Sequence, residues 1–354
     1  MSKKILIDIG HPAQVHCFKN IYNELKQEGH QLIVTSKDKE ITRELLDENG
    51  IPYILLNKRT KSRLFKILEF PRVMFRFGKI IRQFKPDLIL CRFSLHSVWV
   101  GRLFGSVIVG LADSEHTKKL DFLTKPMVQL KLTGDSYSKN LGKNHLRFPS
   151  NLEMLYLHSN RFLFDIDKID QRHKKSEIAI VRFVSWKAHH DVGEKGISDE
   201  HKKEIIQLLN KKFKVLISSE EELPDEFKKY EFDISPNSIH HYIKYARLYV
   251  GEGASMASES ACLGTTVYYV NSLKVGYIEE QAKFGLCKSF RNSDKFLSEF
   301  KSDLETNFDW YRYNNYLNYI SRQIDSTSVL KWIVLNYPFK NESYYKFIDN
   351  SRLK

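Results

Sequence analysis

Along the first part of the chain, short apolar runs alternate with longer segments in which apolar residues recur every three or four positions. The first run, Lys4–Ile9, leads through a turn at Gly10–Ala13 into a helical pattern that ends at Gly29. Repetition of this pattern predicts parallel strands joined by helices. Strands are predicted at Lys4–Ile9, Leu32–Thr35, Tyr53–Leu56, Leu88–Cys91, Val107–Leu111 and Met127–Leu132, and later helices at 40–48, 61–84 with a break near Pro71, and 95–103.

The alternation lapses in the polar segment 158–175 and resumes at Ile178. The second set of strands is predicted at Ile178–Val184, Val215–Ser218, Arg247–Val250 and Thr266–Val270, with helices at 198–209, 238–245, 255–263 and 277–284. Two such sets predict an α/β protein with two Rossmann-like, doubly wound domains. We expect an N-terminal domain at 1–160, a linker at 161–176, a C-terminal domain at 177–337 and a tail at 338–354 that packs back on the N-terminal domain.

Length and composition agree with two domains. The chain has 354 residues, more than one hydrophobic core usually supports, and 42% of them are hydrophobic. No run of 18 apolar residues occurs, and the N-terminus enters a strand rather than a signal peptide. The four scattered cysteines form no Cys-x-x-Cys pair. This pattern favours a cytoplasmic protein with reduced thiols.

The positive charge is concentrated in one segment. The net charge is +13, and residues 58–85 hold ten Lys or Arg against one acid, Glu69. Apolar residues such as Phe65, Phe70 and Phe75 are interspersed among these charges, as in a helix that lies on the anionic inner face of a membrane. The alternative is a core helix with a solvated cationic face. Nucleic acid is not expected as a partner, because no known nucleic-acid-binding motif is present.

A glycine turn between a strand and a helix carries the first candidate chemistry. Residues 251–259 read G-E-G-A-S-M-A-S-E. The exposed N–H groups and the dipole of a helix N-terminus favour a phosphate, here at Gly251, Gly253, Ala254, Ser255 and Met256. Glu259 lies one helical turn after Ser255, where a carboxylate can accept hydrogen bonds from sugar hydroxyls. The alternative is a turn without a ligand, because the third glycine of the dinucleotide fingerprint is missing.

Metal chemistry is not expected. Asp-x-Asp occurs only at Asp165–Asp167, in the segment taken as the linker. His189, His190 and Asp191 are adjacent in sequence, and adjacent side chains rarely converge on one ion. We therefore assign neither a metal nor a cofactor.

Several stretches of the chain together resemble a family of enzymes. They are I-D-I-G-H-P-A-Q-V-H at Ile7–His16, D-S-E-H at Asp113–His116, R-F-V-S-W-K-A-H-H-D-V-G-E-K-G-I-S at Arg182–Ser198, the glycine turn, and V-N-S-L-K-V-G-Y at Val270–Tyr277. The chain resembles GT-B glycosyltransferases, and over Gly253–Glu259 it is similar to the lipid-linked N-acetylglucosamine transferase of peptidoglycan synthesis. Over nearly its full length it looks like a bacterial and archaeal family of predicted glycosyltransferases.

This resemblance implies two Rossmann-like domains that face a central cleft, with a nucleotide-sugar held by the C-terminal domain. The turn at Gly253 would bind the diphosphate and Glu259 the ribose, while the loop 185–196 would lie over the diphosphate. The turns at Gly10 and Gly251 would both face the cleft. The expected contacts are Gly10, Ser185, Lys187, Gly251, Gly253, Ala254, Ser255, Met256, Glu259 and Asn271.

Catalytic groups are expected in the N-terminal domain. His11 or His16, near the first helix, is the candidate base for the acceptor hydroxyl, and the alternative is that both only hydrogen-bond the loop. Glu115 and His116 follow the carboxyl end of a strand, where a carboxylate can orient or activate a histidine. The alternative for this pair is a solvated loop.

The sequence therefore predicts a metal-independent glycosyltransferase. It would move a sugar from a nucleotide-sugar donor, UDP-linked by resemblance, to a glycan or lipid-linked glycan acceptor. One alternative is a non-hydrolysing UDP-sugar 2-epimerase, which shares the fold and the donor site. Another is a membrane-associated protein that binds a nucleotide-sugar without turnover.

Overall fold

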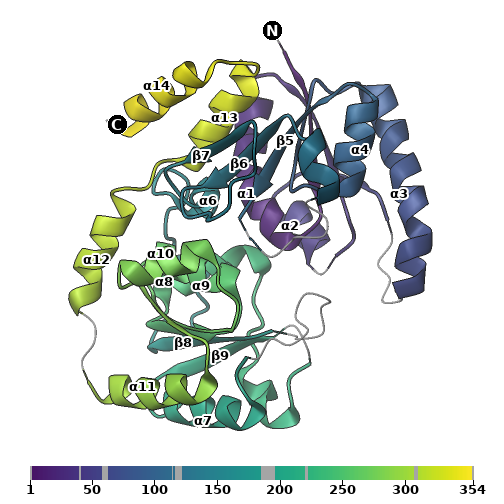
Figure 1. Cartoon of the computed structure of the whole chain (residues 1–354). Helices are drawn as coiled ribbons and strands as arrows, with labels where there is room; N and C mark the ends of the chain where they lie inside the picture. The colour runs from purple at the N-terminus through teal and green to yellow at the C-terminus, as the bar shows by residue number, and fades with distance from the viewer. Residues whose placement is uncertain are drawn as a thin grey trace. The chain divides into compact units, whose positions relative to one another are not determined.

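The computed structural model describes residues 2–39, 41–57, 63–113, 115, 122–184, 196–219, 222–306 and 310–352, and the side chains of all of these except 63–68 and 310–312. The chain forms two units, unit 1 being Met1–Arg161 with Gln323–Lys354 and unit 2 being Phe162–Arg322. Each unit contains a parallel sheet with helices packed on it (Figure 1). The predicted pair of doubly wound α/β domains is confirmed.

Unit 1 contains a seven-stranded sheet in the order β3-β2-β1-β4-β5-β6-β7, and all neighbouring strands run parallel. The strands are β1 (Lys4–Ile9), β2 (Gln31–Ser36), β3 (Ile54–Leu55), β4 (Leu88–Cys91), β5 (Val107–Ala112), β6 (Leu130–Gly134) and β7 (His145–Phe148). The strand order reverses between β1 and β4. In open α/β sheets, ligands bind beside such a switch point, at the carboxyl ends of the strands.

Helices cover both faces of this sheet. All residues of β1 after Lys4 are buried, and successive strand residues point to opposite faces. The helices are α1 (Pro12–Gln27), α2 (Thr42–Glu48), α3 (Arg63–Phe84), α4 (Leu95–Leu103), α6 (Met154–Leu157), α13 (Ser326–Asn336) and α14 (Asn341–Arg352). α3 and α4 lie side by side, and their buried residues form one cluster with residues of β1, β4 and β5 (Figure 1). α1 packs against α6 and α13.

Helix α3 runs without interruption through Pro71. The predicted break near this proline is therefore wrong. A proline removes one N–H donor and crowds the carbonyl four residues earlier, which bends a helix but need not end it. Val73 and Phe77, which follow the proline, are buried in the cluster with α4 and the sheet, so packing holds this part of α3 in place.

Unit 2 contains a five-stranded parallel sheet in the order β12-β11-β10-β8-β9. The strands are β8 (Ile178–Phe183), β9 (Lys214–Ser219), β10 (Leu248–Gly251), β11 (Thr266–Val270) and β12 (Cys287–Phe290). The helices are α7 (Asp199–Leu209), α8 (Ile239–Tyr245), α9 (Ala254–Cys262), α10 (Gly276–Lys283), α11 (Ser293–Glu305) and α12 (Trp310–Ile320). The switch point of this sheet lies between β8 and β10. Short 3-10 turns complete the described elements at Lys125–Met127, Ile166–Lys168, Asp225–Tyr230 and Pro236–Ser238.

The boundaries of the units differ from those expected from the sequence. The chain crosses from unit 1 to unit 2 after Arg161 and returns to unit 1 after Arg322. This second crossing comes before the expected boundary at residue 337, because α13 packs on α1 and α6 of unit 1. Most of the expected linker, 161–176, belongs to unit 2. It packs on α8, where the Asp170 N–H donates to the Tyr242 hydroxyl at 3.0 Å and the Tyr245 hydroxyl donates to the Lys174 carbonyl at 2.6 Å.

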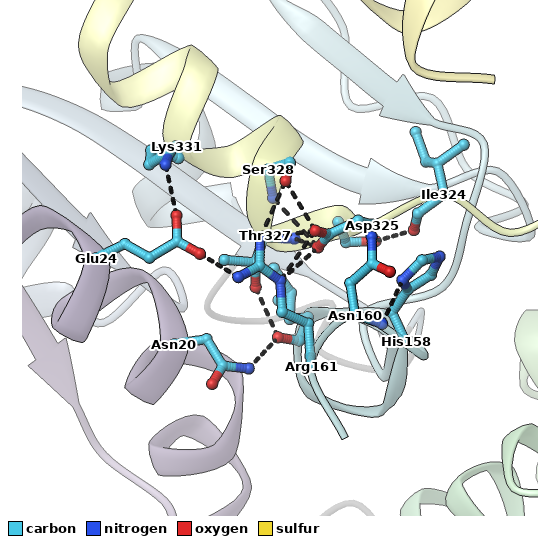
Figure 2. Close-up of polar contacts among 12 residues, drawn as sticks. Asn20, Glu24, His158, Asn160, Arg161, Ile324, Asp325, Thr327, Ser328 and Lys331 are labelled. Carbon is cyan, nitrogen blue, oxygen red and sulfur yellow. Dashed lines mark hydrogen bonds and ion pairs between the residues drawn. The ribbon is translucent and has the colours of Figure 1, made fainter. Parts of the chain in front are cut away.

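The two crossing points are tied together within unit 1. Arg161, the last residue before the first crossing, forms ion pairs with Asp325 and with Glu24 of α1 (Figure 2). Lys331 of α13 lies 2.6 Å from the other Glu24 carboxylate oxygen. Asp325 also caps α13, because its side chain accepts the N–H groups of Thr327 and Ser328. None of the helices described is both long enough and apolar enough to cross a bilayer.

Candidate functional site

The glycine turn lies at the switch point of the unit 2 sheet. β10 ends at Gly251, which pairs with Arg182 of β8. A Cβ atom on Gly251 would lie 2.7 Å from the Arg182 carbonyl oxygen and 2.6 Å from the Tyr249 hydroxyl, so only glycine fits there. The Tyr249 hydroxyl donates to the Gly253 carbonyl at 3.1 Å, and burial raises the pKa of this tyrosine well above its ordinary value. Tyr249 is therefore a neutral hydrogen-bond donor that holds the glycine turn at Gly253.

The first turn of α9 is open to a ligand. The helix begins at Ala254, and its N-cap residue, Gly253, offers no side-chain acceptor to the first N–H groups. Ser255 is exposed, and Gly253, Ala254 and Met256 are half-buried, whereas Ala257–Cys262 are buried. Donors at an uncapped helix N-terminus and the positive end of the helix dipole favour an anion such as a phosphate. Gly251, Gly253, Ala254, Ser255 and Met256 thus lie together at the end of β10 and in the first turn of α9, and their binding of a phosphate stays a prediction.

Glu252, between the two glycines, ties β8 and β10 together. Its carboxylate accepts the N–H of Val184 at 3.1 Å and the N–H of Ile197 at 2.7 Å. Its own N–H donates to the Arg182 carbonyl at 3.1 Å, and the side chain is almost fully buried. This role of Glu252 was not predicted from the sequence. An acidic residue between two glycines at a strand end was the available signal.

Glu259 has a buried histidine partner. His240 of α8 places Nε2 at 3.2 Å from Glu259 Oε1, and both side chains are buried. The Phe162 ring meets the His240 ring edge-on, with the centroids 6.4 Å apart. His240 therefore restricts the directions in which the Glu259 carboxylate can point. The sequence does not indicate this contact, because the two residues lie on different helices.

Asn271, which was expected to contact the nucleotide-sugar, connects the loops that follow β10 and β11. It follows β11 directly, and its Nδ2 donates to the Glu252 carbonyl at 2.9 Å. Its Oδ1 accepts the N–H of Leu273 at 2.9 Å. The Asn271 side chain thus shapes the loop beside the glycine turn. Ser185, Lys187 and His116, which the sequence analysis also assigned to the site, lie outside the described residues.

In unit 1, Gly10 and His11 lie at the carboxyl end of β1 and shape the start of α1. His11 is the N-cap residue, and its Nδ1 accepts the N–H of Ala13 at 3.3 Å. Gln14 reaches back to accept the N–H of Gly10 at 2.7 Å. If Nδ1 accepts a hydrogen bond, the neutral ring carries its proton on Nε2. His11 is half-buried, while His16, further along the same helix, is buried with its ring centroid 5.6 Å from that of Tyr156.

Glu115 is buried and already holds a loop. Its Oε1 accepts the Ser138 N–H at 3.0 Å and the Ser138 hydroxyl at 3.1 Å, and its carbonyl accepts from Lys139. Nearby in sequence, Asp113 forms an ion pair with Arg92, which follows β4. These contacts connect loops after β4, β5 and β6 at the carboxyl edge of the unit 1 sheet.

A buried polar cluster at Asp8 was not anticipated. The carboxylate accepts the hydroxyls of Thr35 at 2.8 Å, Ser94 at 2.5 Å and Ser97 at 2.6 Å, and His96 Nε2 lies 3.0 Å away. Burial alone would raise the pKa of Asp8, but His96 and the serine hydroxyls outweigh burial and lower it well below its ordinary value. The cluster joins β1, β2 and the start of α4 across the switch point. A lone Asp in the apolar strand K-I-L-I-D-I was the available signal.

Within the part of the chain that the structure describes, no three His, Cys, Asp or Glu side chains are grouped in a way that could hold a metal ion. The candidate site in unit 2 therefore consists of backbone N–H groups, the Ser255 hydroxyl and the Glu259–His240 pair. Such groups can bind an anion and hydroxyl groups without a metal.

Comparison with known protein families assigns the chain to a family. The model of the family described as "Protein of unknown function (DUF354)" matches residues 3–280. The chain belongs to this family. The matched range includes all of the expected site residues, from Gly10 to Asn271. No curated protein sequence matched this DUF354 chain.

Solved structures show which fold the DUF354 chain has. It is similar to the S. aureus MnaA–UDP structure, with a TM-score of 0.64, 12% identity and coverage of 98% of this chain and 97% of that chain. For the UDP-GlcNAc 2-epimerase from Neisseria meningitidis bound to UDP-GlcNAc, the TM-score is 0.62 and the identity 13%, with coverage of 94% of this chain and 100% of that chain. For the spinosyn rhamnosyltransferase SpnG complexed with spinosyn aglycone, the TM-score is 0.60 and the identity 9%, with coverage of 93% of this chain and 99% of that chain. These likenesses show the GT-B type of fold, with two parallel-sheet α/β domains, which the sequence analysis predicted.

Proposed function

We propose that this protein is a metal-independent glycosyltransferase that uses a nucleotide-sugar, UDP-linked, as its donor. The observation that carries this proposal is the open N-terminus of α9 at the switch point of unit 2, with Glu259 on the same helix. The N–H groups from Gly253 to Met256 suit the two phosphates of a nucleoside diphosphate. A leaving nucleoside diphosphate gains negative charge in the transition state, and fixed donors and a helix dipole stabilise it.

The position of Glu259 suits the ribose of the same nucleotide. It lies four residues beyond Ser255, which is about 6 Å along a helix at ~1.5 Å per residue. A carboxylate accepts two hydrogen bonds from vicinal hydroxyls, and the fixed His240 contact reduces the cost of orienting it. The similar solved structures include complexes with UDP, with UDP-GlcNAc and with spinosyn aglycone. These complexes support a nucleotide-sugar as the ligand of unit 2.

The acceptor side of the proposal is assigned to unit 1. We place a glycan or lipid-linked glycan near the carboxyl ends of β1 and β5, where Gly10, His11 and Glu115 lie. His11 is favoured over His16 for contact with the acceptor, because it is the less buried of the two. With Nδ1 accepting the Ala13 N–H, His11 can donate from Nε2. It can act as a base only if it gives up that hydrogen bond.

A second function has support from the comparisons. Two of the similar structures, from Neisseria meningitidis and Methanocaldococcus jannaschii, are UDP-GlcNAc 2-epimerases with UDP-GlcNAc bound. An epimerase uses the same donor site and needs no acceptor. The two functions therefore differ in whether the product sugar is attached to an acceptor or still to the nucleotide.

A turnover assay distinguishes these functions. The purified protein is incubated with UDP-linked sugars, with and without lipid and glycan acceptors, and products are resolved by mass spectrometry and nuclear magnetic resonance. The proposal predicts UDP release that depends on acceptor. His11→Asn keeps a good N-cap residue, so it should leave the fold intact and lower kcat by about 10²–10⁴-fold if His11 transfers a proton. Epimerised UDP-sugar without acceptor would favour the epimerase, and binding without either product would leave a nucleotide-sugar-binding protein.

A further inference from the structure

Exposed hydrophobic side chains gather on three neighbouring pieces of unit 1, which we call the α3–α4 face. They lie on α3, on α4 and the residue after it, and on the segment 122–127. The side chains are Phe70, Phe75, Trp99, Leu103, Phe104, Phe122, Leu123 and Met127. Phe75, Leu103 and Phe122 are 78%, 80% and 81% exposed, so these rings and this leucine are almost fully in water.

The three pieces are in direct contact with one another. The Phe104 ring lies 3.8 Å from where a Cβ atom on Gly78 of α3 would be, so the end of α4 rests on α3 (Figure 1). The Trp99 indole N–H donates to the Leu123 carbonyl at 3.0 Å, which joins α4 to the segment 122–127. Trp99 and Leu103 are four residues apart on α4 and therefore share one side of that helix. The pieces that carry the exposed residues are thus adjacent, with α4 in contact with both α3 and the segment 122–127.

Packing separates buried from exposed apolar side chains in residues 69–84 of α3, the part whose side chains the structure describes. Val73, Phe77 and Ile81 are buried in the core with α4 and the sheet. Phe70 and Phe75 remain outside the core and exposed. The expectation of a whole helix lying on a membrane therefore applies only to the side of α3 that faces away from this core, where Phe75 lies with Arg72 and Lys79.

The α3–α4 face is cationic. Arg72, Lys79, Arg82 and Arg102 are exposed, and Lys125 is half-buried. In the ranges 70–84, 95–105 and 122–128, which contain the exposed hydrophobic residues, the sequence has no Asp or Glu. A surface that combines exposed apolar side chains with basic groups, and lacks acidic groups, is complementary to anionic lipid headgroups over an apolar layer.

We propose that the α3–α4 face binds the surface of an anionic lipid bilayer, with Phe75, Leu103, Phe104 and Phe122 entering the interface. Insertion removes these side chains from water, and the basic residues meet the lipid phosphates. Nucleic acid fits this face less well, because Leu103 is aliphatic and cannot stack on a base. This surface lies in unit 1 and does not depend on the nucleotide site proposed for unit 2.

Vesicle flotation with the full chain tests this proposal. The wild-type protein should float with vesicles of phosphatidylcholine and phosphatidylglycerol at low salt, float less at high salt, and stay behind with phosphatidylcholine alone. Arg72→Glu combined with Lys79→Glu should lower the partition coefficient at least about twentyfold, since each basic residue near the surface contributes about fivefold. Leu103→Asp should lower it about tenfold or more, because the leucine can no longer be buried in the interface.

Matched variants separate these effects from changes in overall charge or solubility. Lys211→Glu with Lys295→Glu changes the net charge equally at exposed positions of unit 2, and Leu163→Asp alters a leucine that is 82% exposed elsewhere. These controls should float like the wild type. The proposal is overturned if the wild type does not float at low salt, or if controls and α3–α4 variants lose binding equally. Salt-sensitive binding to a single-stranded oligonucleotide without flotation would assign the face to nucleic acid instead.

Discussion

Replacing Asp8 with Asn is expected to lower the free energy of unfolding of unit 1 by about 3–5 kcal/mol at neutral pH. Asp8 and His96 are each about 2% exposed at the side chain, and their closest atoms are 3.0 Å apart. Asn has the size of Asp but no charge, so the variant leaves the buried His96 and three hydroxyls without the anion around which they are arranged. Breaking a buried pair by removing one partner is among the most destabilising changes a protein can undergo.

The difference in the free energy of unfolding between the wild type and Asp8→Asn should become smaller at acid pH. The pKa of Asp8 is lowered in the folded state, so its carboxylate contributes stability above the unfolded-state pKa of about 3.9. That contribution is lost as the pH falls through the folded-state pKa. The wild type therefore loses stability below about pH 4, whereas Asp8→Asn lacks the carboxyl group and does not lose this part.

Urea unfolding at neutral and acid pH, with hydrogen exchange of α4 peptides as a local readout, measures this prediction. Asp294→Asn is the matched control, because Asp294 also faces a histidine, His201 at 3.6 Å, but is 83% exposed. The control should change stability much less than Asp8→Asn. Equal effects of the two variants, or a deficit that does not depend on pH, would contradict the role given to the Asp8 cluster.

Replacing Arg161 with Gln is expected to cost about 3 kcal/mol, the lower end of the range for breaking a buried ion pair. The Arg161 side chain is 17% exposed and contacts both Asp325 and Glu24 (Figure 2). Its Nε lies 3.0 Å and 2.9 Å from the two Asp325 oxygens, and its third contact is the Ser328 hydroxyl at 3.0 Å. Without the guanidinium, Asp325 loses its cationic partner, while Glu24 keeps Lys331 at 2.6 Å.

The network around Arg161 also affects the pKa of Asp325. Burial would raise this pKa, but hydrogen bonds from Arg161 and Ser328 outweigh burial and lower it. Asp325 therefore contributes stability above the ordinary Asp pKa and loses it as the pH falls through the lowered value. Arg161→Gln removes the main cause of the shift, so the variant should have a weaker acid dependence than the wild type.

Amide hydrogen exchange by mass spectrometry checks this prediction locally, in the helices that contact Arg161. Exchange in α1 and α13, the helices that Arg161 joins, should become faster in Arg161→Gln. Arg172→Gln is a close control, because the Arg172–Asp170 and Arg161–Asp325 ion pairs both have a closest distance of 2.6 Å, but Arg172 and Asp170 are 75% and 35% exposed. Surface pairs contribute little, so this control should leave exchange in α1 and α13 unchanged. Unchanged exchange in both variants would remove Arg161 as the group that holds the two crossing points.

Most of the strands and helices could be predicted from the sequence, because their hydrophobic periodicities are local patterns. The parallel strands from β1 to β5 and from β8 to β11 lie close to the predicted positions. β7 and β12 were missed because polar residues interrupt their apolar pattern, as in His145–Phe148. Met127 is the end of a 3-10 turn rather than the start of a strand, and β6 begins at Leu130.

The candidate site could be predicted only where its residues are consecutive. The glycine turn and the first turn of α9 form one stretch of sequence, and the structure keeps them together. The partners of Glu259 and Asp8 are His240 and His96, which lie on other elements and meet them only after the sheets form. Local patterns contain no information about such contacts, so these histidines were missed. The domain boundary at Gln323 was missed for the same reason, since it depends on the packing of α13.

Calorimetric titration with UDP measures whether the N-terminus of α9 binds the diphosphate of a nucleotide. The wild type should bind UDP saturably, and 2′-deoxy-UDP about tenfold or more weakly because Glu259 loses a ribose hydroxyl. Ser255→Glu places a carboxylate in the first turn of α9, where it stabilises the helix but repels phosphate. We expect a folded Ser255→Glu protein, with an undiminished melting temperature, that no longer binds UDP. Wild-type protein that does not bind UDP, or a Ser255→Glu variant that binds it as tightly as the wild type, would show that the N-terminus of α9 is not a diphosphate site.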